Sequence, residues 1–152
     1  MESVETNQIT HLGGVISARI ASLSSVIWFM KLGSRALISL LTPSAWQPLP
    51  LVNQKTQADE SVSDEDGFLV TTSRLSIPVY LGSGTDKRMI EEYLKYGALI
   101  KITFASGSTM VFGSKRHPLT GTLRQVHGTR HSESPYYLIE CSSPGEGLLL
   151  GG

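Results

Sequence analysis

The sequence predicts an α+β fold that is mainly β: an antiparallel β-sandwich or barrel with one flanking helix. Several short segments alternate apolar and polar residues with the period of two that a half-buried strand requires. One segment has the apolar spacing of a helix, and turns that contain glycine or proline separate the segments. A chain of 152 residues suits a single domain, residues 1–152, which can bury roughly two-thirds of the surface that it exposes when unfolded.

The first strand is expected in "VISARIASL", residues 15–23, where apolar and polar residues alternate. Residues 24–43 suit either a buried strand or a helix, and Gly33 interrupts either one. The three prolines in the following stretch, residues 43–50, predict an extended connector or an edge strand, because proline lacks an N–H donor.

Residues 53–67, "NQKTQADESVSDEDG", combine five acidic residues with little that could be buried. Such a composition cannot offset its own ordering entropy, so we expect an acidic mobile loop here. Asp64, Asp66 and Gly67 resemble part of a calcium loop, but the third acidic ligand and the closing glutamate are missing. A solvated surface loop is therefore the preferred interpretation.

The strand pattern returns in "FLVTTSRLSIPVYL", residues 68–81, and Pro78 predicts that this strand lies at a sheet edge or contains a bulge. A helix follows, because Thr85 can cap it, Asp86 suits its N-terminal dipole and Gly97 ends it. The face expected to pack on the sheet consists of Met89, Ile90, Tyr93 and Leu94.

A β-hairpin is expected in "ALIKITFASGSTMVFG", residues 98–113. Ile100, Ile102 and Phe104 share one side of its first strand, residues 105–108 suit a turn, and residues 109–112 resume the extended pattern. Two further strands are expected in "GTLRQVH" and "YYLIEC", and residues 144–152 are expected to form an irregular C-terminal tail.

The overall composition excludes strong global attraction to nucleic acid or to an anionic membrane, because 13 basic residues balance 13 acidic ones. The apolar stretch from Val15 to Leu41 is interrupted by Arg19, Lys31 and Arg35, so we expect no transmembrane helix. The lone cysteine, Cys141, favours a buried inert thiol, and with the acidic, polar start of the chain it suggests an intracellular origin.

No residue cluster in the sequence predicts catalysis, a cofactor or a metal. His127 and His131 lie four residues apart beside Glu133, but glycine and proline nearby favour a loop and the ligand set is incomplete. The glycines of "LGSGTDK" suit a loop before a helix better than an anion site, and no G-x-S-x-G elbow is present. We therefore expect a protein that is not an enzyme and needs no cofactor.

Charge is segregated along the chain, which suggests a subunit interface. Exposed charges usually contribute little, so two solvated loops are the plain interpretation. The sharper hypothesis is that acidic residues of one subunit meet basic residues of the next in a heterologous contact. The candidate interface residues are Asp59, Glu60, Asp64, Glu65, Asp66, Lys115, Arg116, Arg124 and Arg130.

The order of these elements resembles that of small virion proteins of tailed phages, those that build tail tubes and neck rings, particularly in phages of Bacteroides-type hosts. The resemblance runs from about Gly13 to Pro144, and its markers are Gly113 and Ser114 after the second hairpin strand, with Pro118 soon after. It implies a structural protein of the virion, hexameric rings, a long loop that reaches a neighbouring ring, and contacts with other tail or neck proteins. It implies no membrane contact, and contact with passing DNA only in a tube.

The alternative function is a small β-barrel module that binds a peptide or an oligonucleotide through its hairpins. Stacked aromatic residues with interleaved basic residues would favour nucleic acid, and only Phe104 and Phe112 come near that pattern.

Overall fold

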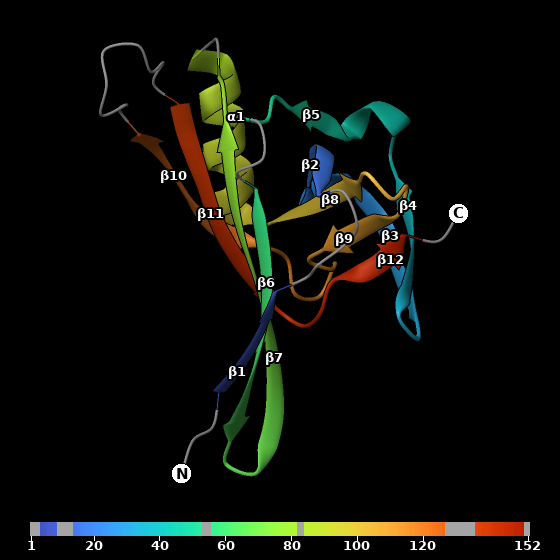
Figure 1. Ribbon diagram of the computed structural model, residues 1–152. Helices are drawn as coiled ribbons and strands as arrows, with labels where there is room; N and C mark the ends of the chain where they lie inside the picture. The colour runs from blue at the N-terminus through green and yellow to red at the C-terminus, as the bar shows by residue number, and fades with distance from the viewer. Residues whose placement is uncertain (1–3, 9–13, 53–55, 82–83, 127–135, 151–152) are drawn as a thin grey trace.

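Two β-sheets and one helix form the structure, a computed structural model that describes residues 4–8, 14–52, 56–81, 84–126 and 136–150 (Figure 1). The first sheet, sheet A, has the strand order β1 (Val4–Gln8), β6 (Gln57–Glu65), β7 (Phe68–Val79), β11 (Tyr136–Pro144) and β10 (Thr120–Val126). All its neighbouring strands are antiparallel.

The second sheet, sheet B, has the order β3 (Val26–Leu32), β4 (Arg35–Leu40), β12 (Leu148–Leu150), β9 (Thr109–Phe112), β8 (Ala98–Phe104), β2 (Val15–Ser22) and β5 (Gln47–Leu49). Among the strands that the structure describes, only β12 and β4 pair in parallel. Short 3-10 turns at Leu23–Ser25 and Pro43–Ala45 connect its strands. The prediction of an α+β fold that is mainly β is confirmed. Because both described sheets are open, the fold is sandwich-like rather than a closed barrel.

The main core lies between the inner face of sheet A, the helix and one face of sheet B. Ile77 and Ile139 enter it from sheet A, and Ile100, Ile102 and Phe112 enter it from sheet B. A smaller cluster on the other face of sheet B contains Val26, Ala36, Leu99, Val111 and Leu148. Sheet B is therefore buried on both faces over its centre, which explains why β8 contains buried residues at consecutive positions.

The helix α1, Gly84–Tyr96, packs on the core as the sequence predicted. Ile90 and Leu94 are fully buried, and Met89 and Tyr93 are partly buried against the same cluster. It ends at Gly97, whose φ is +117° and whose N–H donates to the Tyr93 carbonyl over 2.8 Å. The side chain of the expected cap, Thr85, lies outside the described residues.

The predicted hairpin of residues 98–113 is confirmed, because β8 and β9 pair antiparallel from Ile100 opposite Phe112 to Thr103 opposite Thr109. The strands expected at residues 15–23, 121–127 and 136–141 correspond to β2, β10 and β11. Residues 24–43, left open between strand and helix, form the hairpin of β3 and β4. Within the described residues, no helix is both long enough and apolar enough to cross a membrane.

The expectation of an acidic loop over residues 53–67 is wrong. Residues 57–65 form β6, which lies between β1 and β7 and exchanges ladder hydrogen bonds with both, while residues 53–55 lie outside the description. The strand is possible despite its composition because its neighbours supply the backbone partners that the acidic residues do not supply themselves. A turn at Asp66 and Gly67, with φ of 52° and 84°, joins β6 to β7.

Two further expectations need correction. The strand that contains Pro78 is not at an edge, because β7 pairs with both β6 and β11. Pro78 is tolerated since the register with β6 ends at Ser76, and its carbonyl still accepts a hydrogen bond from the Val52 N–H over 3.0 Å. The tail of residues 144–152 is not irregular throughout, because β12 inserts between β4 and β9.

Sheet A continues beyond the body of the molecule. The pairing of β7 with β11 ends where Pro144 lies opposite Thr72, while β6 and β7 pair on to Glu65 opposite Phe68. We call residues 61–72 the arm. Figure 1 shows it projecting away from the helix and from sheet B, with β1 along one side.

The close approach at the end of α1 predicts a difference between two glycine substitutions. An added Cβ at Gly97 would lie 2.9 Å from Pro118, whereas one at Gly107, φ +93°, would meet nothing within 4 Å. Gly107→Ala should cost about 1–2 kcal/mol from backbone strain alone. Gly97→Ala should cost about 1–3 kcal/mol more, since overpacking adds to the same strain. Urea unfolding measures both, and equal losses would contradict the steric argument.

Candidate self-association surface

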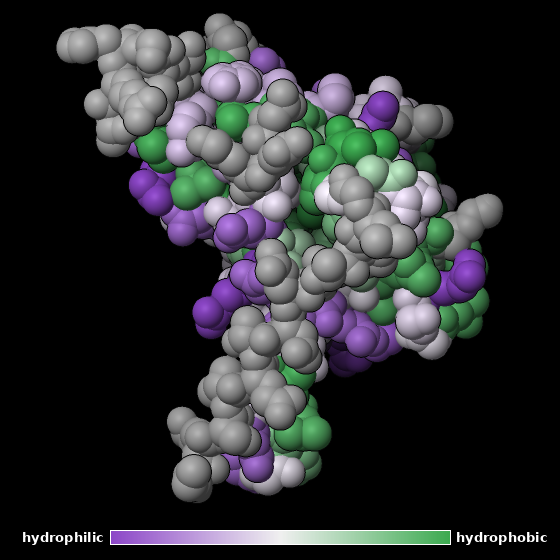
Figure 2. Space-filling view, viewed as in Figure 1, coloured by the Kyte–Doolittle hydropathy of each residue, from purple (hydrophilic) through white to green (hydrophobic). Residues whose placement is uncertain are grey.

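The end of the arm presents apolar and acidic side chains to solvent. Phe68 is 75% exposed and Leu69 is 78% exposed, the two largest values among the exposed large hydrophobic residues described. Asp64 and Asp66 are exposed beside them, and Asp64 Oδ1 accepts the Gly67 N–H over 3.1 Å, which supports the turn. We call Asp64, Asp66, Phe68 and Leu69 the arm tip. Figure 2 shows hydrophobic surface on the arm, apart from the body of the molecule.

The turn itself follows directly from its residues. Two consecutive positive φ values between paired residues define a two-residue type I′ turn, the geometry for which Asp-Gly is a preferred sequence. Its twist matches that of the flanking strands, so β6 and β7 can pair to their last residues. The tip is therefore the end of a regular hairpin with a defined direction.

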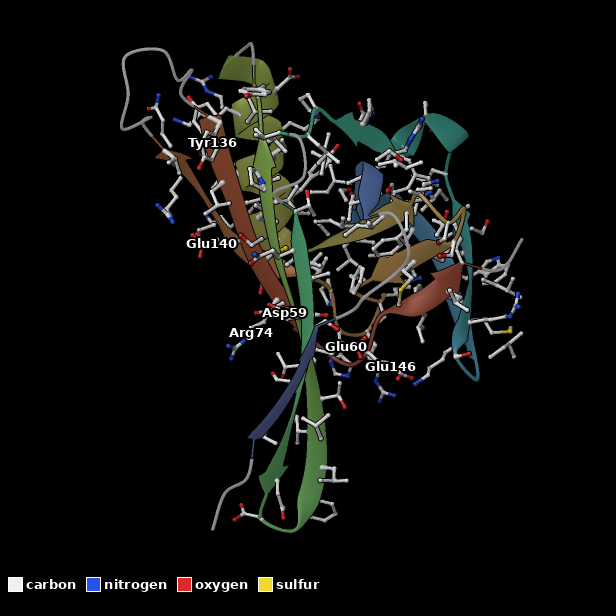
Figure 3. The ribbon with its side chains drawn as sticks, in the orientation of Figure 1. Asp59, Glu60, Arg74, Tyr136, Glu140 and Glu146 are labelled. Carbon is white, nitrogen blue, oxygen red and sulfur yellow. The ribbon has the colours of Figure 1, made fainter. Side chains whose placement is uncertain are left out.

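Asp59 and Glu60, two of the predicted interface residues, lie at the base of the arm. Glu60 faces the interior and its Oε1 accepts the Gly147 N–H over 2.7 Å, which joins β6 to the connection between β11 and β12. Asp59 lies opposite Arg74 on the outer face of sheet A. Figure 3 shows Arg74 and Glu140 on that face and Glu60 and Glu146 on the other, toward β12. Glu60 thus acts within the subunit.

Lys115 and Arg116, the basic part of the hypothesis, are exposed in the connection between β9 and β10. Lys115 Nζ donates to the Ile27 carbonyl over 2.7 Å. Ile27 occupies a register irregularity of β3, so its carbonyl is not matched to β4. Lys115 therefore stabilises the outer strand of sheet B and keeps its charge at the surface.

A pocket of about 510 Å³ opens beside these two cations. We call it the basic pocket. Phe29, Pro144 and Leu148 supply apolar lining, and Lys31, Lys115, Arg116 and Glu146 supply charge. Lys31 Nζ lies 3.4 Å from Glu146 Oε1, so the one carboxylate among the described lining residues is already paired. The remaining lining is Gly113, Ser114, His117 and Gly145.

Arg124 lies elsewhere, on the outer face of sheet A. Its Nε donates to Glu140 Oε1 over 2.7 Å, and both side chains are about half exposed, so the pair adds little stability. Arg130, like His127, His131 and Glu133, lies outside the described residues, and the side chain of Glu65 does too. Of the nine predicted interface residues, the structure thus places two at the tip, two at the pocket and three in other places, and it does not describe the side chains of the remaining two, Glu65 and Arg130.

Among the residues that the structure describes, no three His, Cys, Asp or Glu side chains gather as metal ligands. Cys141, on β11, is buried in the main core, and burial raises the pKa of its thiol to about 12. Burial also lowers the pKa of Lys101, helped by the charge of Arg19 opposite it, while the Lys101 ammonium lies 4.7 Å from the centre of the Trp46 ring.

Reasoning from the sequence missed the apolar half of the surface. Phe68 and Leu69 follow the Asp-Gly pair directly, and a hairpin turn at that pair would have placed them at an exposed tip. It also missed Ile27, Trp28, Met30 and Leu32, which are 44–54% exposed on β3, an edge strand of sheet B.

Comparison with known proteins finds no matching family model and no match among curated proteins or solved structures.

The buried thiol predicts both slow chemistry and a pH dependence. In native protein at pH 8, Cys141 should react with a thiol reagent at least about 100-fold more slowly than in urea, because only the thiolate attacks and the site is covered. Stability should fall as the pH rises from about 9 toward 12, since the unfolded chain releases this proton first. Reagent kinetics and unfolding midpoints measure the two effects, and Cys141→Ala should remove the contribution of this thiol. Rapid modification of the native thiol would contradict the burial.

Proposed function

We propose that this protein is a non-enzymatic structural subunit that self-associates into rings or a tube. The observation that carries the proposal is the arm, a regular hairpin that extends beyond the sandwich and exposes two large apolar side chains at its end. In an isolated subunit, the exposed apolar tip carries an unfavourable hydration free energy. A partner that covers the tip removes this cost. A projecting hairpin adds nothing to the core of its own subunit, so its natural role is contact with another chain.

The edge strand β3 gives independent support. Its outer side is unpaired in sheet B, and four of its seven residues are exposed large hydrophobics. Soluble monomers usually protect such edges with charge, bulges or covering segments. Here the bulge at Ile27 and its bond to Lys115 protect one end only. The exposed remainder suits a chain whose edges are covered in an assembly.

We infer further that the assembly belongs to the virion of a tailed phage, as a tail-tube or neck-ring component with hexameric rings and other tail or neck proteins as neighbours. The support is the resemblance in element order, together with the two-sheet fold, the flanking helix and the long hairpin. A binding module for a peptide or an oligonucleotide remains the second candidate, because the basic pocket offers apolar lining and cations together.

The arm tip predicts the behaviour of one double variant. Phe68→Ser with Leu69→Ser should weaken self-association by about tenfold or more, because two large apolar side chains leave the contact. Sedimentation velocity over a range of micromolar concentrations measures this. Tyr96→Ser is the matched control, since Tyr96 is 67% exposed at the C-terminal end of α1, outside both the arm and the basic pocket, and should leave association unchanged. A wild-type protein that stays monomeric at every concentration and salt would overturn the proposed function.

A further inference from the structure

We propose that the arm tip of one subunit inserts into the basic pocket of a second copy of the same chain. This inference rests on the proposed self-association and names the two surfaces that meet. It predicts a heterologous contact, in which every subunit both supplies a tip and receives one.

The apolar parts of the two surfaces match. The pocket, at about 510 Å³, falls within the range of roughly 300–1,000 Å³ that holds compact ligands, and Phe29, Pro144 and Leu148 give it apolar walls. Phe68 and Leu69 are the apolar side chains that the tip exposes most. A rigid aromatic side chain that fills an apolar pocket is the common form of an interface anchor.

The charged parts match as well. Lys115 and Arg116 border the pocket, and its one carboxylate, Glu146, already pairs with Lys31. Lys115 uses one hydrogen bond on the Ile27 carbonyl, and an ammonium group has three donors. Asp64 and Asp66 flank the apolar tip, so an inserted tip brings carboxylates to the cationic rim. Charges of opposite sign at the rim favour this pairing over others.

A subunit cannot fill its own pocket. Gly145, which lines the pocket, donates its N–H to the Thr71 carbonyl over 2.7 Å, and Ser73 Oγ donates to the Gly145 carbonyl over 2.6 Å. The arm therefore starts at the rim of the pocket and runs outward as a paired hairpin, which places Phe68 about 10 Å beyond Thr71 at the usual strand rise. Figure 1 shows the tip pointing away from β3 and β12. The occupant must be another copy.

Cross-linking tests which surfaces meet. One chain carries Leu69→Cys at the tip, and another carries His117→Cys at the pocket, where His117 is exposed; the native thiol of Cys141 is buried. Mild oxidation of the mixture should give a disulfide-linked heterodimer. Its yield should be several times that of the homodimers that each variant forms when it is oxidised alone. Ser24→Cys, exposed near the C-terminal end of α1 rather than at the basic pocket, is the matched partner and should give no more than background. If the chains associate but this cross-link does not form, the docking of the tip in the pocket is wrong, and the proposed self-association is still supported.

Charge reversal tests the proposed pairing between the carboxylates of the tip and the cations at the pocket rim. Arg116→Glu should weaken association about tenfold or more and flatten its salt dependence, while adding Asp66→Lys should restore most of the affinity. Lys115 is left in place because its bond to Ile27 holds β3. Arg88→Glu, an exposed arginine on α1, is the control. An unchanged unfolding midpoint shows that each variant is folded, and wild-type association by Arg116→Glu would overturn the charge pairing.

A third experiment distinguishes a second copy of the chain from a nucleic acid as the occupant of the basic pocket. A short fluorescent single-stranded DNA serves as the alternative ligand. If the DNA binds and Arg116→Glu abolishes that binding while association persists, the pocket belongs to nucleic acid and the docking is overturned.

Discussion

β7 pairs with β6 and with β11, and these two strands extend over different parts of it. The rest of the structure depends on this constraint. From Thr72 to Ser76, β7 lies between β6 and β11, and its C-terminal half sends Leu75, Ile77 and Val79 into the core. Before Thr72, β7 has no partner in β11, because the chain after Pro144 turns at Gly145 toward sheet B. One strand therefore anchors the arm in the core and also forms the arm, so the direction of the tip is set by the packing of the sandwich.

The junction between arm and body is held by polar contacts. The Gly145 N–H to Thr71, the Ser73 hydroxyl to Gly145, and the Gly147 N–H to Glu60 all cross from the β11–β12 connection to the base of the hairpin. Ser73 is almost fully buried, so its hydroxyl requires that partner. An isolated hairpin is marginal in water, and this one gains a third strand from β1 along its other side. The arm is thus built as part of a sheet.

The sequence predicted the elements whose periodicity is local. The hairpin of β8 and β9 and the buried face of α1 both follow from spacing within about ten residues. The sequence could not predict β6, because the acidic residues of this strand resemble a solvated loop. The strand also depends on partners that are distant in sequence. The overlooked signal was Asp66-Gly67, treated as part of a failed calcium loop rather than as a type I′ turn. For the candidate surface, charge segregation pointed to Asp64, Asp66, Lys115 and Arg116, but the apolar partners depend on which side chains the sheets leave uncovered.

A contact between a projecting tip and a pocket has a consequence for the form of the assembly. Such a contact joins different surfaces, so it closes into a ring only if the rotation between neighbours divides a full turn, and otherwise it continues as a helix. The arm leaves the body beside the pocket, which means that tip and pocket are linked through a few hydrogen-bonded residues at Thr71 and Gly145. The angle between neighbours is then fixed mainly by the arm's direction at that junction. Ring size is therefore a property of the arm base, while affinity is a property of the tip, and the two can be altered separately.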